Sequence, residues 1–268
     1  MSQPADGDSP SGDACHTPSD SAGVPWEGRA FRENAHSDDD GSAPLDFLAA
    51  IASFRAGEAG PDAVVDALRG VRLLTPLVAE RGEEGLSSRG HVVDKTQELS
   101  IVTVAAPDGR TVMPVFSSVT AMSSWDAGAR PIPTPAVRVA QAAVGEGTDL
   151  IVVDPGSETE FVVRRPAVWA LARGEDWMPP HASPAVRQAF LESIASELAA
   201  IDVELSAGDP QAHLRGPETI VRLRLLDGLD RRELDAVLGR LAQRWAADDR
   251  IATLVDSLTV KLERGAAS

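Results

Sequence analysis

The spacing of hydrophobic and polar positions divides the chain into predicted helices and strands. Around residues 99–118, two arms rich in β-branched residues flank Asp108 and Gly109, a pair that favours a tight turn, so the pattern predicts a β-hairpin. A short helix ending near Trp125 is expected to follow it. Upstream, apolar positions three and four apart, each group closed by glycine, predict helices over residues 44–56 and 61–69.

Prolines and short apolar runs predict the strands that accompany these helices. Residues 71–78 read as a strand but contain Pro76, which is tolerated only at a sheet edge or a bulge. Two prolines within residues 129–133 indicate a second extended segment at an edge. The other predicted elements here are a helix at 135–144 with Val139, Ala143 and Val144 inward, strands at 149–153 and 160–163, and a helix at 165–172.

A second mixture of helix and strand begins at residue 183. Ser183 and Pro184 are suited to begin a helix, and Asp230 is suited to cap a long amphipathic one. The order helix, strand, strand, helix, strand predicts a small sheet with helices on one face only. Alternating residues predict its strands, which are 201–205 with Ile201, Val203 and Leu205 inward, 219–226 with Val221, Leu223 and Leu225 inward, and 258–263.

This arrangement predicts an α+β protein made of two small domains, each a mainly antiparallel sheet packed with helices. A tail rich in Ser, Asp, Gly and Pro precedes them and is expected to be disordered, because it cannot bury enough apolar surface to offset its ordering entropy. The predicted boundaries are an acidic tail at 1–41, a first domain at 42–176, a linker at 177–182 and a second domain at 183–268.

The composition of the chain argues against two classes of binding partner. The 268 residues carry a net charge of −16, which repels phosphate backbones and anionic lipids, so neither nucleic acid nor a membrane is expected as a partner. The single cysteine, Cys15, excludes an intrachain disulfide. The first 22 residues are polar and acidic, and no apolar run approaches the roughly 18 residues of a membrane span. We therefore expect a cytoplasmic protein, either monomer or homodimer.

Two groups of residues are candidates for binding another protein. In the tail, Trp26 and Phe31 flank Arg29 and could dock on the folded body or on a partner; the alternative is a free tail with incidental aromatic residues. On the predicted second sheet, Arg222 and Arg224 alternate with the inward positions, and Lys261 does so on the last strand. Their face could set the specificity of a docking partner, or it could be a solvated face with cross-strand charge pairs.

Catalytic and metal-binding patterns are not found in the sequence. It has no nucleophile elbow, no glycine-rich phosphate loop and no pair of histidines on one helix face. The acidic run beside His36 fits no defined metal site. The serines near the hairpin are suited to turns and helix caps, and no general base is evident beside them. We therefore expect no enzyme activity, no metal and no cofactor.

Several motifs carry a family resemblance. The segment from Met113 to Ser118, with Trp125 beyond it, resembles the Leu-Pro-Val-Phe-Thr-Ser motif of the SseB family, named after the enhanced serine sensitivity protein. The strand that ends in Asp154-Pro155-Gly156-Ser157 resembles a second motif, Asn-Pro-Gly-Ser. Here Ser117 stands for the usual threonine and Asp154 for the usual asparagine. The resemblance covers about residues 42–175 and extends plausibly to a second, C-terminal SseB-type domain; it implies no catalytic residues.

The sequence supports two functions of different kinds. The first is a non-enzymatic protein-interaction or adaptor module. The alternative is a small-molecule-binding regulatory protein, which the resemblance links to amino-acid metabolism. A pocket for such a ligand is expected beside the hairpin and the Asp154 turn, at Phe116, Ser117, Trp125, Asp154 and Ser157.

Overall fold

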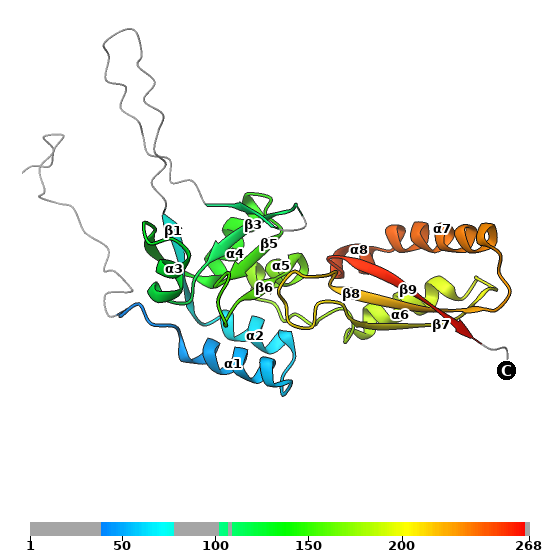
Figure 1. Ribbon diagram of the computed structural model, residues 1–268, viewed down its shortest axis with the longest axis horizontal. Coiled ribbons are helices and arrows are strands. Elements are labelled where there is room, and N and C mark those ends of the chain that lie inside the picture. Colours follow the sequence, from blue (N-terminus) through cyan, green and yellow to red (C-terminus); the bar gives the residue numbers. More distant parts are fainter. Residues whose placement is uncertain (1–38, 78–101, 107–108, 266–268) are drawn as a thin grey trace, which may run out of the picture. The chain divides into compact units, whose positions relative to one another are not determined.

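The computed structural model describes residues 39–77, 102–106 and 109–265 (Figure 1). The described residues from Asp40 onward belong to one compact unit. Helices and antiparallel-rich sheets are mixed throughout the described part, which confirms the α+β class. The predicted tail contacts at Trp26, Arg29 and Phe31 lie outside the described residues. The domain boundaries near residues 177–182 stay a prediction.

The first two helices begin and end where the sequence predicts. Helix α1 (Leu45–Ala56) ends at Gly57, whose φ of +74° is the left-handed conformation that glycine adopts without strain. Helix α2 (Pro61–Leu68) begins at a proline, which needs no hydrogen-bonded N–H in the first turn. Their apolar faces are buried through Phe47, Ile51, Val64, Val65 and Leu68.

The predicted hairpin organises a four-stranded sheet. Strand β2 (Val104–Ala105) pairs antiparallel with β3 (Thr111–Val115), and Gly109 between them has a φ of +83°. This confirms the described part of the hairpin. Strand β3 also pairs with β5, and these two run parallel, so their carboxyl ends meet at one edge. The sheet order is β2-β3-β5-β6, with β5 at Leu150–Val153 and β6 at Phe161–Val163.

Two strands that contain proline form a two-stranded ribbon. Strand β1 (Arg72–Leu77) pairs antiparallel with β4 (Arg130–Pro135), and Pro76 lies opposite Pro131. Both strands of a two-stranded sheet are edge strands, so the edge placement predicted for Pro76 is confirmed. The helices of this region are α3 (Val119–Trp125), α4 (Ala136–Gly145) and α5 (Arg165–Arg173). The inward prediction for Val144 is wrong: it is 43% exposed, and Ala140 is buried in α4 instead.

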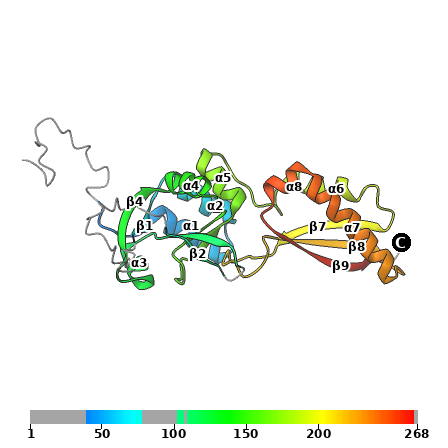
Figure 2. The same cartoon turned by 90° about the horizontal axis from the view of Figure 1, so that it is seen from above.

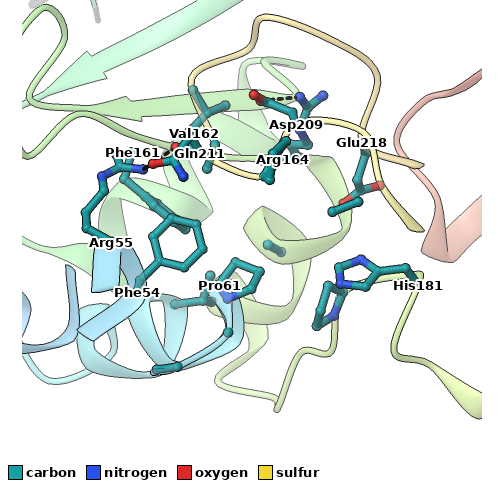
Figure 3. A pocket seen from close by; sticks show the side chains of 18 of the residues that line it. Phe54, Arg55, Pro61, Phe161, Val162, Arg164, His181, Asp209, Gln211 and Glu218 are labelled. Atoms are coloured by element: carbon teal, nitrogen blue, oxygen red, sulfur yellow. Dashed lines mark hydrogen bonds and ion pairs between the residues drawn. The ribbon is translucent and has the colours of Figure 1, made fainter. Parts of the chain in front are cut away.

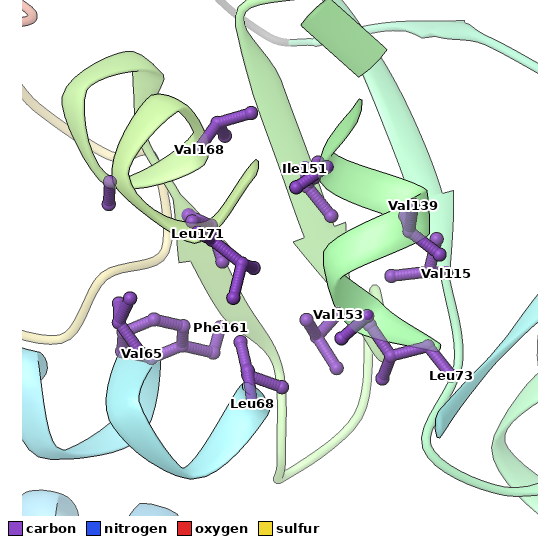
Figure 4. Close-up of a cluster of buried hydrophobic side chains, with 14 of the residues drawn as sticks. Val65, Leu68, Leu73, Val115, Val139, Ile151, Val153, Phe161, Val168 and Leu171 are labelled. Atoms are coloured by element: carbon purple, nitrogen blue, oxygen red, sulfur yellow. The ribbon is translucent and has the colours of Figure 1, made fainter. Parts of the chain in front are cut away.

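One hydrophobic core joins helices α1, α2, α4 and α5 to strands β1, β3, β5 and β6 (Figure 4). Helices α1 and α2 approach it from one side, and α4 and α5 pack against the strands. The cluster is drawn from every element type, so its burial couples the helices to the sheet. Its larger members include Phe47, Leu68, Leu73, Val115, Ile151, Phe161, Val168 and Leu171.

The later residues form a three-stranded sheet with helices on one face, as predicted (Figure 2). The strand order is β7-β8-β9, with β8 antiparallel to β7 and parallel to β9. Asp230 begins the longest of these helices in a capping box with Glu233. The elements are α6 (Pro184–Ile194), β7 (Ala200–Ala207), β8 (Thr219–Leu226), α7 (Arg231–Ala247), α8 (Asp249–Leu254) and β9 (Leu258–Gly265).

The inward placement of Ile201 is wrong. The register moves from Ala200 opposite Leu225 directly to Asp202 opposite Arg224, which leaves Ile201 as the extra residue of a β-bulge. Its side chain is 41% exposed. Simple alternation fails here because a bulge interrupts the period of two, and alternation resumes at Val203 after it.

The charged face of this sheet pairs its charges across strands. Arg222 contacts Glu263 at 3.3 Å and Arg224 contacts Asp202 at 3.0 Å, with all four side chains about 40% exposed. Exposed pairs of this kind contribute roughly 0.2–1 kcal/mol each. We therefore expect the double variant Arg222→Glu, Arg224→Glu to stay folded and to lose about 1–2 kcal/mol, measured by urea unfolding. A loss of cooperative unfolding would contradict the exposed-face assignment.

Candidate functional site

A cavity of about 420 Å³ lies where α1, α2 and β6 meet the segment after α5 and the connection from β7 to β8 (Figure 3). We call it the Glu218 cavity. Its apolar walls include Phe54 and Phe161, whose rings meet edge to face at 5.5 Å. Val65, Ala167 and Trp177 extend the same walls. Its size falls within the range of small-molecule sites in proteins.

Glu218 supplies a buried carboxyl group at this cavity. The residue is 8% exposed, and its Oε2 accepts a hydrogen bond from the Asp256 backbone N–H at 2.7 Å. Among the described residues, Oε1 has no hydrogen-bond partner. Burial, opposed mainly by that hydrogen bond, raises the pKa of Glu218 from 4.5 to about 7. A buried polar atom without a partner is rare enough in proteins to need an explanation.

Arg164, a buried cation that lines the same cavity, is already paired with carboxylates. Arg164 is 6% exposed and bridges two buried carboxylates, Asp209 at 2.8 Å and Asp256 at 3.1 Å. It also donates to the backbone oxygen of Gly216 at 2.8 Å. Arg110 adds a second contact to Asp256 at 2.9 Å. This network holds the β7–β8 connection and the residues after α8 against β6.

His181 and Arg55 also line the cavity. Burial lowers the pKa of His181, although the charge of Asp62 opposes the shift. Figure 3 shows the Glu218 carboxyl group directed toward the His181 ring, while Arg55 lies on the far wall. Arg55 is committed to the backbone oxygens of Glu160 and Gln211. Trp177 also lines the cavity, and its buried indole Nε1 has no hydrogen-bond partner among the described residues.

The raised pKa of Glu218 predicts that the stability of the protein depends on pH. The folded protein holds a proton that the unfolded chain releases at lower pH, so this residue's contribution to stability falls as pH rises from about 4.5 to about 7. We expect wild type to lose stability relative to Glu218→Gln across that interval. Urea unfolding of both proteins at several pH values measures the difference. A difference that does not change with pH would contradict the assignment.

The residues predicted to form a pocket beside the hairpin form two separate contacts. Phe116 packs against Trp125 at 5.3 Å. The fully buried Asp154 accepts hydrogen bonds from the backbone N–H and the Oγ of Ser117, both at 2.6 Å. Ser157 joins this group through Thr159, which donates to Asp154 at 2.7 Å. None of these residues lines the Glu218 cavity, and a ligand pocket beside the hairpin stays a prediction.

A comparison with known protein families finds one match. Residues 47–170 match the model of the SseB protein N-terminal domain, a segment that contains the hairpin, the Asp154 turn and one side of the cavity. The chain therefore carries an SseB N-terminal domain. No curated protein and no solved structure matches the chain. A second, C-terminal SseB-type domain stays a prediction.

Two further features, a metal-binding group and a membrane-spanning helix, are absent from the described residues. In that part, no group of three His, Cys, Asp or Glu side chains is placed to hold a metal ion. No helix there is both long and apolar enough to cross a membrane. Sequence reasoning did not single out Glu218 as a candidate. The available signal was the Pro-Glu-Thr step at 217–219, which places an acidic side chain directly before a buried strand.

Proposed function

We propose that this protein is a non-enzymatic small-molecule-binding protein and that the Glu218 cavity holds its ligand. The observation that carries the proposal is Glu218 itself, which is more than nine-tenths buried at an aromatic-walled cavity with one oxygen unpartnered among the described residues. A bound hydrogen-bond donor would satisfy that oxygen. The proposed link to amino-acid metabolism rests on the family resemblance alone, and cytoplasmic location is supported by the single cysteine.

A cavity-filling variant tests this function. Ala207 lines the cavity, so Ala207→Phe should occupy part of it, whereas Ala242→Phe places the same ring on the exposed side of α7. We expect some members of a fragment panel of amines, alcohols, amides and carboxylates to raise the melting temperature of wild type and of Ala242→Phe, because ligands stabilise the state they bind. Ala207→Phe should lose that response. No response from wild type, or an equal one from Ala207→Phe, would overturn the proposal.

The sheet edges favour protein interaction as a second function. Within the described residues, β7 and β9 each leave one edge without a partner strand, and Leu262 on β9 is 45% exposed. Unpaired edges accept an added strand from another protein. Lys261 is exposed on the same strand, where it could orient a partner. This supports an adaptor role at the second sheet.

Affinity capture from the source cell's lysate tests the adaptor role. We expect a stoichiometric partner on the full chain that is lost with Leu262→Lys, which adds a charge at the edge. A chain starting at Gly41 examines the Trp26 segment in the same experiment. Recovery of bare protein from the full chain would count against an adaptor.

A further inference from the structure

We propose that the ligand of the Glu218 cavity is a small primary amine, bound as an ammonium ion that donates to the Glu218 carboxylate, with an apolar body between the aromatic walls. This inference rests on the proposed function and specifies its ligand class. It draws on three features of the described residues, namely the unpartnered acceptor, the charges around it and the apolar lining.

The charges around Glu218 leave its carboxylate without a cation of its own. Arg164 is committed to two carboxylates and a backbone oxygen. Arg165, from the same segment, donates to the backbone oxygens of Ala252 and Val255, both at 3.0 Å. The other ionisable groups near this end are Asp256, Asp209 and His181. Arg110 contacts Asp256, and the charge of Asp62 acts on His181.

Because the Glu218 carboxylate has no paired cation, a cationic ligand fits this site better than an anion. A buried carboxylate is stabilised by a paired cation, and an added anion would be repelled by Glu218, whereas Asp209 and Asp256 are already paired with arginine. An ammonium group carries three donors, enough for Oε1 and for neighbouring acceptors. The chain's net charge of −16 also attracts cations from solution.

The walls favour an apolar body next to the ammonium group. Phe54, Phe161 and Trp177 present aromatic surface to the cavity. Burying a hydrocarbon group against this aromatic surface is favourable in free energy, and the faces of the rings attract a nearby cation. Arg55, the one cation that lines the far wall among the described residues, is held by backbone oxygens 2.5 Å away and by its contact with the Phe54 ring.

Binding of an amine should release a proton. Free Glu218 has a pKa of about 7, so part of the population is protonated near neutral pH, while an alkylamine with a pKa of about 10 stays charged. A bound cation favours the carboxylate, and the proton of Glu218 passes to the solvent. Affinity should therefore rise as pH increases from about 6 to about 8.

Calorimetry with three matched probes tests the ligand class. The probes 2-phenylethylamine, 2-phenylethanol and 3-phenylpropionate share a phenyl body and differ in the charge of the polar group. We expect the amine to bind wild type most tightly and to release protons, seen as a dependence of the heat on buffer ionisation. Glu218→Gln should weaken amine binding by about tenfold or more, while Glu204→Gln, at an exposed position outside the cavity, should not change it.

The outcomes separate this inference from the proposed function. Tighter binding of the alcohol or the carboxylate, lost in Ala207→Phe, would overturn the amine and leave the small-molecule site standing. Amine binding that Glu218→Gln leaves unchanged would overturn the role of Glu218. Failure of all three probes would overturn the amine, and the fragment panel then decides separately whether the cavity binds small molecules. Circular dichroism of each variant shows that it is folded.

Discussion

Asp154→Ala is expected to lower the free energy of unfolding by about 3 kcal/mol or more. Asp154 is completely buried and accepts hydrogen bonds from the Ser117 backbone N–H, the Ser117 Oγ and the Thr159 Oγ1. Alanine would leave the buried N–H without a partner. It would also occupy a φ of +51°, which aspartate and asparagine tolerate better than alanine. Chemical unfolding monitored by circular dichroism measures the loss.

Asp154→Asn is the matched control. The amide oxygen can accept from the Ser117 N–H, and its NH₂ group can donate to the two hydroxyl oxygens, which accept as well as donate. We expect this variant to lose no more than about 1 kcal/mol. The family motif usually carries asparagine here, and a mild effect would agree with the structural role. Equal losses in both variants would instead indicate that the negative charge itself stabilises the fold.

Arg164→Met is expected to destabilise the protein by about 3–5 kcal/mol. Methionine keeps a similar length and fills the space, but it leaves Asp209 and Asp256 buried without this cation. Both side chains are at most 5% exposed, so the cost of an unpaired charge is close to its full value. Thermal and urea unfolding measure the change. Arg222→Met, at a pair about 40% exposed, is the control and should cost less than about 1 kcal/mol.

A second-site change checks the cause. Asp209→Asn removes the charge of one of the two carboxylates that lose Arg164, whereas Asp256 keeps its contact with Arg110. The double variant Arg164→Met, Asp209→Asn should therefore recover part of the lost stability. Recovery would identify the buried charge as the source of the loss. If the double variant is less stable than Arg164→Met, lost packing or the lost bond to Gly216 would explain the effect better.

Local patterns in the sequence predicted the elements correctly where a single short-range force decides them. Gly57 ends α1 and Asp230 caps α7 because both effects act within one helical turn. Alternation placed Val221, Leu223 and Leu225 inward because β8 is regular along its whole length. It misplaced Ile201, since a bulge depends on the partner strand's register, and Val144, since the buried side of α4 depends on the neighbours it meets.

The candidate site was beyond the reach of such patterns. Ser117 and Asp154 are 37 residues apart, and their contact follows from the parallel pairing of β3 with β5. Glu218 became a candidate only because the β7–β8 connection folds against β6, through Arg164 and Asp209. Burial and pairing over long sequence separations set both its pKa and its unpartnered oxygen.

By itself, therefore, the sequence of this protein determined its helices, its strands, its α+β class and its SseB N-terminal domain, since these depend on residue spacing, turn chemistry and short motifs. The tertiary structure alone decided which polar side chains are buried together and where a cavity opens. The physical reason is that desolvation and charge pairing act through space, between residues that the chain brings together only after it has folded.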